Sequence, residues 1–266
     1  MDRVRTATPG VPVPQPQPTP TRPPQTAAAV QLDAVTKHFP NGPDVTVALD
    51  AVTLTIAPGT FTAVMGPSGS GKSTFLNCAA GLERPTSGTV RIAGRDLGAL
   101  RPDDVTRVRR DHVGFVFQGY DLVPHLTVAE NVALPVTLAG RHVAAGRVRS
   151  LLGSVGLDGL QRRLPAELSG GQAQRVAIAR ALVTEPDVVF ADEPTGALDV
   201  RAAEQVLTLL RSAVDDLGRT LVLVTHDPRA AERADEVVFL ADGRVQDRLP
   251  RSGAHEIASR LLDLGR

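Results

Sequence analysis

A glycine-rich stretch of nine residues constrains the fold more than any other part of the chain. Residues 66–74 read Gly-Pro-Ser-Gly-Ser-Gly-Lys-Ser-Thr and satisfy the pattern G-x-x-x-x-G-K-[ST]. The apolar run Phe61–Met65 before it predicts a strand, and Lys72–Ala80 after it predicts a helix. In this order the turn points backbone N–H groups inward and the helix N-terminus adds positive potential, so the stretch predicts a phosphate-binding loop.

The residue types of this loop suit a nucleotide and its magnesium ion. We expect binding roles for Gly66, Pro67, Ser68, Gly69, Ser70, Gly71, Lys72, Ser73 and Thr74. Lys72 would reach the β- and γ-phosphates, and the Ser73 hydroxyl would bind Mg²⁺. Only Lys37 and Lys72 are lysines among the 29 basic residues, and the residue frequencies predict roughly 0.002 chance matches to the pattern. A chance turn is therefore a poor alternative.

Strand-like and helical segments alternate over residues 29–250. Strands are predicted at Ala29–Val35, Val45–Ile56, Phe61–Met65, Thr89–Ile92, Val113–Phe117, Val188–Ala191, Leu221–Thr225 and Glu236–Leu240. Helices are predicted at Lys72–Ala80, Pro102–Arg110, Val128–Leu138, Gly170–Val183, Arg201–Leu217 and Pro228–Arg233. Residues 120–168 are almost wholly helical in pattern. The layout predicts an α/β sheet that carries an antiparallel β layer at its start and a helical insertion.

Polar residues suited to nucleotide chemistry follow three further strands. Val188–Ala191 leads directly into Asp192 and Glu193. Neighbours on a strand point to opposite sides, so Asp192 would hold Mg²⁺ while Glu193 acts as general base on the attacking water. Gln118 and His226 also follow apolar strands, where α/β sheets bind ligands. Gln118 would reach the metal or the water; in isolation, a histidine like His226 is more often structural.

A second anion-binding sequence, Leu168-Ser169-Gly170-Gly171-Gln172, opens the predicted helix at Gly170–Val183. A serine and two glycines at a helix N-terminus bind anions through free N–H groups. Two phosphate-binding ends in one chain make sense if two copies pack head to tail and each completes the site of the other. The nucleotide-contacting residues expected here are Ser169, Gly170, Gly171 and Gln172.

Taken together, the motifs resemble those of ABC-transporter nucleotide-binding subunits, in the same order, over about residues 30–245. The resemblance implies a P-loop NTPase with a RecA-like parallel core, an antiparallel β layer and an α-helical subdomain at about 119–168. ATP and Mg²⁺ are the implied cofactors, and ATP hydrolysis the implied reaction. A P-loop kinase would not explain the signature at 168–172.

The resemblance also implies roles for single residues. Gln118 matches the glutamine loop, near the metal, and His226 matches the histidine that senses the γ-phosphate. Phe39 stands where an aromatic ring, more often Tyr, stacks on adenine; alone it would suggest a core residue. Residues 196–199, Gly-Ala-Leu-Asp, match the loop that crosses the dimer interface. The implied catalytic residues are Lys72, Gln118, Glu193 and His226.

Three segments narrow the subgroup. Gly114–Gln118, Leu126–Val132 and Asp192–Asp199 resemble the macrolide-exporter and lipoprotein-releasing ATPases. The resemblance implies a separate integral-membrane permease as partner and a place at the cytoplasmic face of the plasma membrane. We expect the permease to dock in the groove between core and helical insertion, close to Gln118–Thr127, where Leu122, Val123 and Leu126 are apolar. Alternatively, these leucines pack under the insertion.

Two other functions stay open. A soluble ABC ATPase without a permease usually has two cassettes or a long coiled-coil insertion, whereas the interval from Lys72 to Ser169 holds only a short helical one. A division-type signalling ATPase uses the same machinery without moving a substrate. Importer, exporter and signalling roles are not separable from these residues.

Composition excludes several classes. Lys+Arg 29 against Asp+Glu 29 gives zero net charge, which disfavours nucleic acid as a partner. The single Cys78 excludes an intrachain disulfide, and no apolar run suits a membrane span or signal peptide, so we expect a soluble cytoplasmic chain. Residues 1–28 contain eight prolines and predict a disordered tail rather than an SH3-type docking peptide. A C-terminal helix is expected over residues 251–266.

Overall fold

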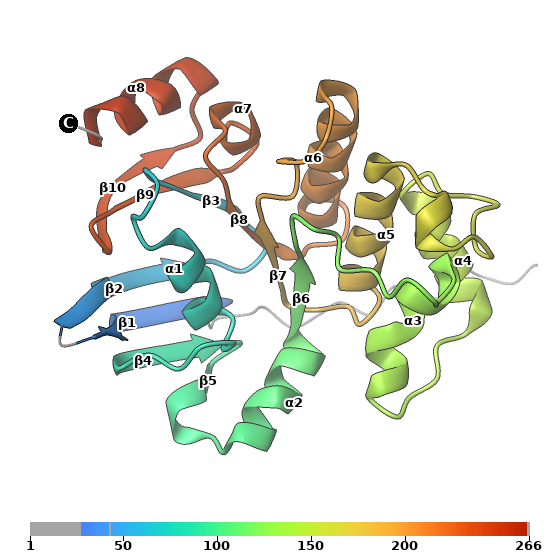
Figure 1. Ribbon diagram of the computed structural model, residues 1–266, viewed down its shortest axis with the longest axis horizontal. Coiled ribbons are helices and arrows are strands. Elements are labelled where there is room, and N and C mark those ends of the chain that lie inside the picture. Colours follow the sequence, from blue (N-terminus) through green and yellow to red (C-terminus); the bar gives the residue numbers. More distant parts are fainter. Residues whose placement is uncertain (1–27, 43, 265–266) are drawn as a thin grey trace, which may run out of the picture.

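The computed structural model describes residues 28–42 and 44–264. Apart from Ala28, the predicted Pro-rich tail lies outside the described residues. Two sheets and the helices around them make up the described part of the chain (Figure 1). No helix in those two ranges has both the length and the apolar character needed to cross a bilayer.

The larger sheet has six strands in the order β10-β9-β3-β8-β7-β6. Their bounds are β3 Phe61–Met65, β6 Val113–Val116, β7 Val188–Asp192, β8 Thr220–Val224, β9 Glu236–Ala241 and β10 Arg244–Pro250. All neighbouring strands from β9 to β6 pair in parallel, and β10 pairs antiparallel with β9. The expected parallel core is therefore confirmed. β10 was not predicted, because its residues are mostly polar and include no apolar run; Leu249 alone among them is buried.

The smaller sheet is the expected antiparallel layer, with strand order β2-β1-β4-β5. Its strands are β1 Val30–Asn41, β2 Asp44–Ile56, β4 Ser87–Ile92 and β5 Arg95–Asp96. Helix α1, Lys72–Ala79, packs with buried Phe75 and Leu76 in one hydrophobic core that takes side chains from both sheets. The start of α1, where the phosphate loop ends, is thus held between two β layers.

The other face of the six-stranded sheet carries the remaining large helices. They are α5 Gly170–Leu182, α6 Val200–Asp215, α3 Val128–Leu138 and α4 Ala145–Ser154, and their buried side chains share a second core with β3, β7 and β8. In Figure 1, α3 and α4 lie at the opposite side of the molecule from β1 and β2. The expectation of an almost wholly helical stretch over 120–168 was wrong in extent. Loops occupy 118–127 and most of 155–168, because turns held by backbone hydrogen bonds interrupt the helices.

Three more helices complete the described elements: α2 Pro102–His112, α7 Pro228–Ala231 and α8 Ala254–Leu264. Helix α8 falls within the predicted C-terminal helix, and its Ile257 is fully buried in the second core. The 3-10 turns span Leu97–Ala99 and Pro165–Glu167.

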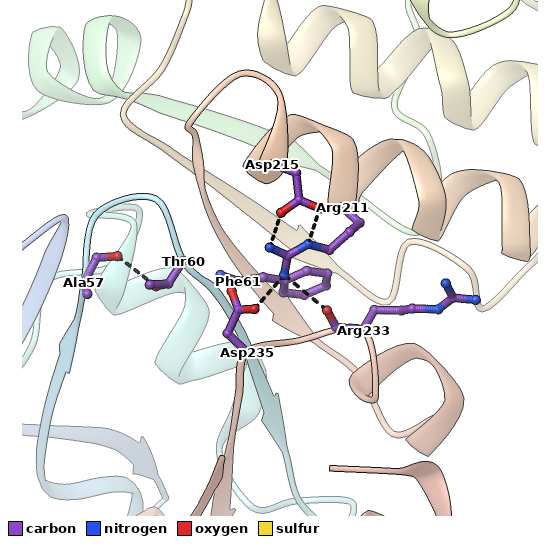
Figure 2. A network of polar contacts seen from close by, with 7 residues as sticks. All are labelled: Ala57, Thr60, Phe61, Arg211, Asp215, Arg233 and Asp235. Atoms are coloured by element: carbon purple, nitrogen blue, oxygen red, sulfur yellow. Dashed lines mark hydrogen bonds and ion pairs between the residues drawn. The ribbon is translucent and has the colours of Figure 1, made fainter. Parts of the chain in front are cut away.

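An ionic cluster ties α6 to the amino end of β3 (Figure 2). The Arg211 guanidinium donates to both carboxylate oxygens of Asp215, one helical turn on, and to Asp235 at 2.9 Å. Asp235 in turn accepts a hydrogen bond from the backbone N–H of Phe61 at 2.9 Å. The same guanidinium lies 5.9 Å from the centroid of the Phe61 ring. This cluster lies at the end of β3 opposite to the phosphate loop.

Candidate nucleotide-binding site

Several of the predicted site residues lie at one edge of the parallel sheet. The phosphate loop follows β3, Asp192 ends β7, and His226 and Gln118 come shortly after β8 and β6. Because these four strands are parallel neighbours in the order β3-β8-β7-β6, their carboxyl ends meet at that edge. The structure therefore brings together residues that lie up to 160 positions apart in sequence.

Backbone geometry shapes the phosphate loop. Gly69 and Gly71 have φ of 80° and 96°, a region that favours glycine. A Cβ on Gly66 would lie 2.0 Å from the Leu240 carbonyl oxygen, so only glycine allows the loop to pack against β9. Lys72 Nζ donates to the carbonyl oxygens of Gly66 and Pro67, at 2.8 Å each. The Lys72 ammonium group thus bridges the first two residues of its own loop.

Charge and an unpaired hydroxyl make this loop suitable for a phosphate group. Burial lowers the pKa of Lys72, while the nearby carboxylates of Glu193 and Asp192 raise it. Burial and then Glu193 raise the pKa of Asp192, while Lys72 lowers it. Among the described residues, the buried Ser70 hydroxyl has no hydrogen-bond partner. A partly desolvated cation and an unpaired hydroxyl fit an anionic oxygen-rich ligand. The nearby hydroxyl and carboxylate oxygens of Ser73 and Asp192 are of the kind that Mg²⁺ prefers.

Glu193 is held in a strained backbone conformation. Its φ is 44°, unusual for a residue other than glycine, and its N–H donates to the Val224 carbonyl at 2.9 Å. The carboxylate lies 2.7 Å from His226 Nδ1 and accepts a hydrogen bond from Thr225 Oγ1 at 3.3 Å. His226 is 73% exposed and Glu193 only 18%. The structure thus pairs Glu193 and His226, two of the four residues for which catalytic roles were expected.

The loop after β6 contacts two other motifs. A Cβ on Gly196 would lie 2.8 Å from Gln118 Nε2, so the Gln118 side chain lies against the segment that follows Glu193. A Cβ on Gly170 would lie 2.7 Å from the Tyr120 hydroxyl, which places Tyr120 against the signature. Arg180 donates to the carbonyl oxygens of Tyr120 and Asp121. Neither Tyr120 nor Arg180 belongs to a motif, so the sequence did not predict a role for either residue.

The signature is a capped helix start. Ser169 Oγ accepts from the Gln172 N–H at 3.3 Å, and Gln172 Oε1 accepts from the Ser169 N–H at 3.0 Å. A Cβ on Gly171 would lie 2.9 Å from Ala202 Cβ, so α6 packs closely here. Within the described ranges no hydrogen bond joins residues 169–172 to the phosphate loop. One copy of the chain therefore does not unite the two predicted phosphate-binding ends.

Phe39 lies in β1, next to an irregularity in its pairing with β2 between Lys37 and His38. It is 38% exposed, which is unusual for a large apolar ring, and Lys37 Nζ lies 4.9 Å from its centroid. The ring is therefore accessible to a ligand, as the prediction of a base-stacking residue requires.

Comparison with known proteins identifies the family. Residues 49–196 match the sequence profile described as "ABC transporter". The lipoprotein-releasing system ATP-binding protein of Anaeromyxobacter dehalogenans is 49% identical over 236 residues, which cover 87% of this chain and 99% of that protein. The chain belongs to the ABC transporter family. The family predicted from the motifs is thus confirmed.

One solved member of the ABC transporter family has the same fold, and another relative is a longer protein. A dimeric ATP-binding cassette, solved in a post-hydrolysis state bound to ADP and Pi, matches with a TM-score of 0.77 and 41% identity over 84% of this chain and 99% of that one. The predicted P-loop fold is therefore confirmed. A macrolide export ATP-binding/permease protein of Chromobacterium violaceum is 45% identical over 242 residues, 90% of this chain. The present chain spans 37% of the length of that relative.

Proposed function

We propose that this chain is the ATP-binding and ATP-hydrolysing subunit of an ABC transporter and powers a separate integral-membrane permease. The observation that carries the proposal is the lysine-bridged phosphate loop beside Asp192 and Glu193, at one edge of the parallel sheet. Relatives over nearly the full length of the chain include a lipoprotein-releasing ATP-binding protein, which supports the same role.

In this proposal the loop residues 66–74 bind the ATP phosphates and Lys72 exchanges its two carbonyl partners for phosphate oxygens. Ser73, Asp192 and Gln118 hold Mg²⁺, which neutralises phosphate charge when bound. Glu193 accepts the proton of the attacking water, and His226 orients the Glu193 carboxylate, to which it is already hydrogen-bonded, and contacts the γ-phosphate. Phe39 stacks on the adenine base.

Two copies of the chain complete the site. Ser169, Gly170, Gly171 and Gln172 of one copy contact the nucleotide held by the phosphate loop of the other. Support comes from the separation of the two motifs within one chain and from the dimeric cassette that matches this fold.

The permease docks beside the loop after β6, and this places the ATPase at the cytoplasmic face of the plasma membrane. A cavity of about 350 Å³ lies there, lined by the side chains of Phe115, Phe117 and Arg180 among others. The two phenylalanine rings stack with centroids 5.0 Å apart. Leu122 is partly buried and packs against the second core, so it is a poor choice for testing the docking surface. Replacing only Leu126 with Ser should therefore reduce permease-stimulated ATPase activity and spare the basal rate; an unchanged stimulated rate places the interface elsewhere.

Calorimetry with Mg·ATP tests the nucleotide site. Lys72→Ala removes the cation that faces the phosphates, so ATP affinity should fall at least tenfold. Arg149→Ala, a surface change on α4, is the matched control and should bind like the wild type. Unchanged affinity in the Lys72 variant would overturn the assignment of the loop.

A further inference from the structure

Lys37 is the other lysine of the chain besides Lys72, and none of the roles above uses it. Its side chain is 12% exposed, and its ammonium group has three neighbours. It forms an ion pair with Glu83, donates to the Arg84 carbonyl oxygen at 2.9 Å, and lies 4.9 Å from the centroid of the Phe39 ring. A cation within about 6 Å of an aromatic centroid is attracted to the ring face.

Two hydrogen bonds also join β1 to the segment in which Glu83 and Arg84 lie. The Thr86 N–H donates to the Thr36 carbonyl at 2.8 Å, and the His38 N–H donates to Thr86 Oγ1 at 3.0 Å. Residues 83–86 follow α1, the helix that begins at the phosphate loop. The strand carrying Phe39 is therefore anchored to the segment at the far end of α1, and Lys37 joins that anchor to the ring itself.

The geometry points to Lys37 as a positioning residue for the purine base, acting through Phe39. This inference rests on the proposed nucleotide site and extends it. The ammonium group holds the ring plane from one side, and the exposed part of the ring stays open to the base. The positive charge also draws electron density toward its side of the ring, which favours stacking of an electron-rich purine on the open side.

A charge-free variant and two ligands separate this role from a general structural one. Lys37→Met keeps the length of the stem and removes the charge. We expect its Kd for Mg·ATP to rise about three- to tenfold. The Kd for Mg·tripolyphosphate, which has no base, should change less than twofold. A structural defect in the phosphate loop would weaken both ligands equally, and that result overturns the proposal.

Two further variants identify the partner through which Lys37 acts. Glu83→Gln removes the ion pair but leaves the cation beside the ring, so ATP affinity should stay within twofold of the wild type. In a Phe39→Leu background, Lys37→Met should change ATP affinity less than twofold, because the ring is absent. If Glu83→Gln weakens ATP as much as Lys37→Met, or if the Lys37 effect persists without Phe39, the inference is wrong.

Failure of the role of Lys37 can be told apart from failure of the nucleotide site itself. If the wild-type chain bound neither ATP nor tripolyphosphate, the nucleotide site itself would fail. If the wild type bound both and Lys37→Met bound ATP like the wild type, only the role of Lys37 would fail. Thermal melting of each variant without ligand verifies that the fold is retained.

Discussion

Arg211→Met should destabilise the chain through the ionic cluster of Figure 2. Methionine keeps most of the aliphatic stem of Arg211 but loses the guanidinium, whose side chain is only 19% exposed. Four contacts disappear: the two-pronged interaction with Asp215, the bond to Asp235 at 2.9 Å, the bond to the Arg233 carbonyl oxygen at 3.4 Å and the approach to the Phe61 ring. Asp235 keeps the hydrogen bond from the Phe61 N–H, so its carboxylate retains one donor.

The size of the effect follows from how exposed each partner is. A charge-assisted hydrogen bond is worth about 1.5–3 kcal/mol, and Asp235, 35% exposed, should approach the lower figure. Asp215 is 52% exposed, so solvent screens its ion pair and this contact adds little. The long cation–π contact adds about 0.5 kcal/mol. We therefore expect a loss of about 2 kcal/mol in the free energy of unfolding, or about 4–8 °C in Tm for a chain of this size.

Urea and thermal unfolding of Arg211→Met measure this loss. Arg201→Met, at an exposed position on the same helix, is the matched control and should shift Tm by less than 2 °C. The Arg211 side chain also holds the pKa of Asp215 below its ordinary value. That contribution is present above the ordinary carboxyl pKa and is lost as pH falls through the lowered one, so the gap between wild type and variant should narrow in acid. A Tm for Arg211→Met equal to that of Arg201→Met would refute this account.

Three other predictions concern the site and the core. Gly196→Ala should displace the Gln118 side chain, because its new Cβ would lie 2.8 Å from Gln118 Nε2; basal ATPase activity should change at least twofold, and the same substitution in a Gln118→Ala background should have no effect. Burial raises the pKa of the Cys78 thiol to about 11, above its unfolded value, so its stabilising contribution is complete below about pH 8.5 and is lost as pH rises through 11. Between pH 8 and pH 10, the free energy of unfolding measured in urea should therefore fall by about 1–2 kcal/mol more in the wild type than in Cys78→Ala. Glu193→Gln should slow turnover about 10²–10⁴-fold and accumulate an ATP-bound dimer on size-exclusion chromatography; a monomer with wild-type turnover would contradict the role of Glu193.

The sequence was sufficient for elements whose signal is local. The strands at 61–65, 188–191 and 221–224 are short apolar runs, and burial on both faces of a parallel sheet requires that pattern. Strand β10 was not predictable in the same way, because pairing along the edge of β9, rather than its own composition, makes it a strand. The motifs located Lys72, Asp192 and Glu193 because their residue types and neighbours recur together.

Contacts between motifs could not be predicted from the sequence. The positive φ of Glu193 depends on a backbone bond to Val224 in a different strand. Arg180 looks like any surface arginine of an amphipathic helix until the loop after β6 presents two carbonyl oxygens to it. Such contacts arise from tertiary packing and have no periodicity or spacing that a reader of the sequence could detect.

The bridge made by Lys72 has a consequence for ligand choice. Two of its donors form hydrogen bonds with the Gly66 and Pro67 carbonyl oxygens of the same loop, at 2.8 Å each. An incoming anion must therefore outcompete two good internal acceptors before it gains the lysine. A single orthophosphate offers few oxygens and no second anchor, whereas a chain of phosphates attached to a base meets the loop and the aromatic ring at once. We therefore expect a nucleoside triphosphate to displace the two carbonyl partners of Lys72 more readily than free orthophosphate does.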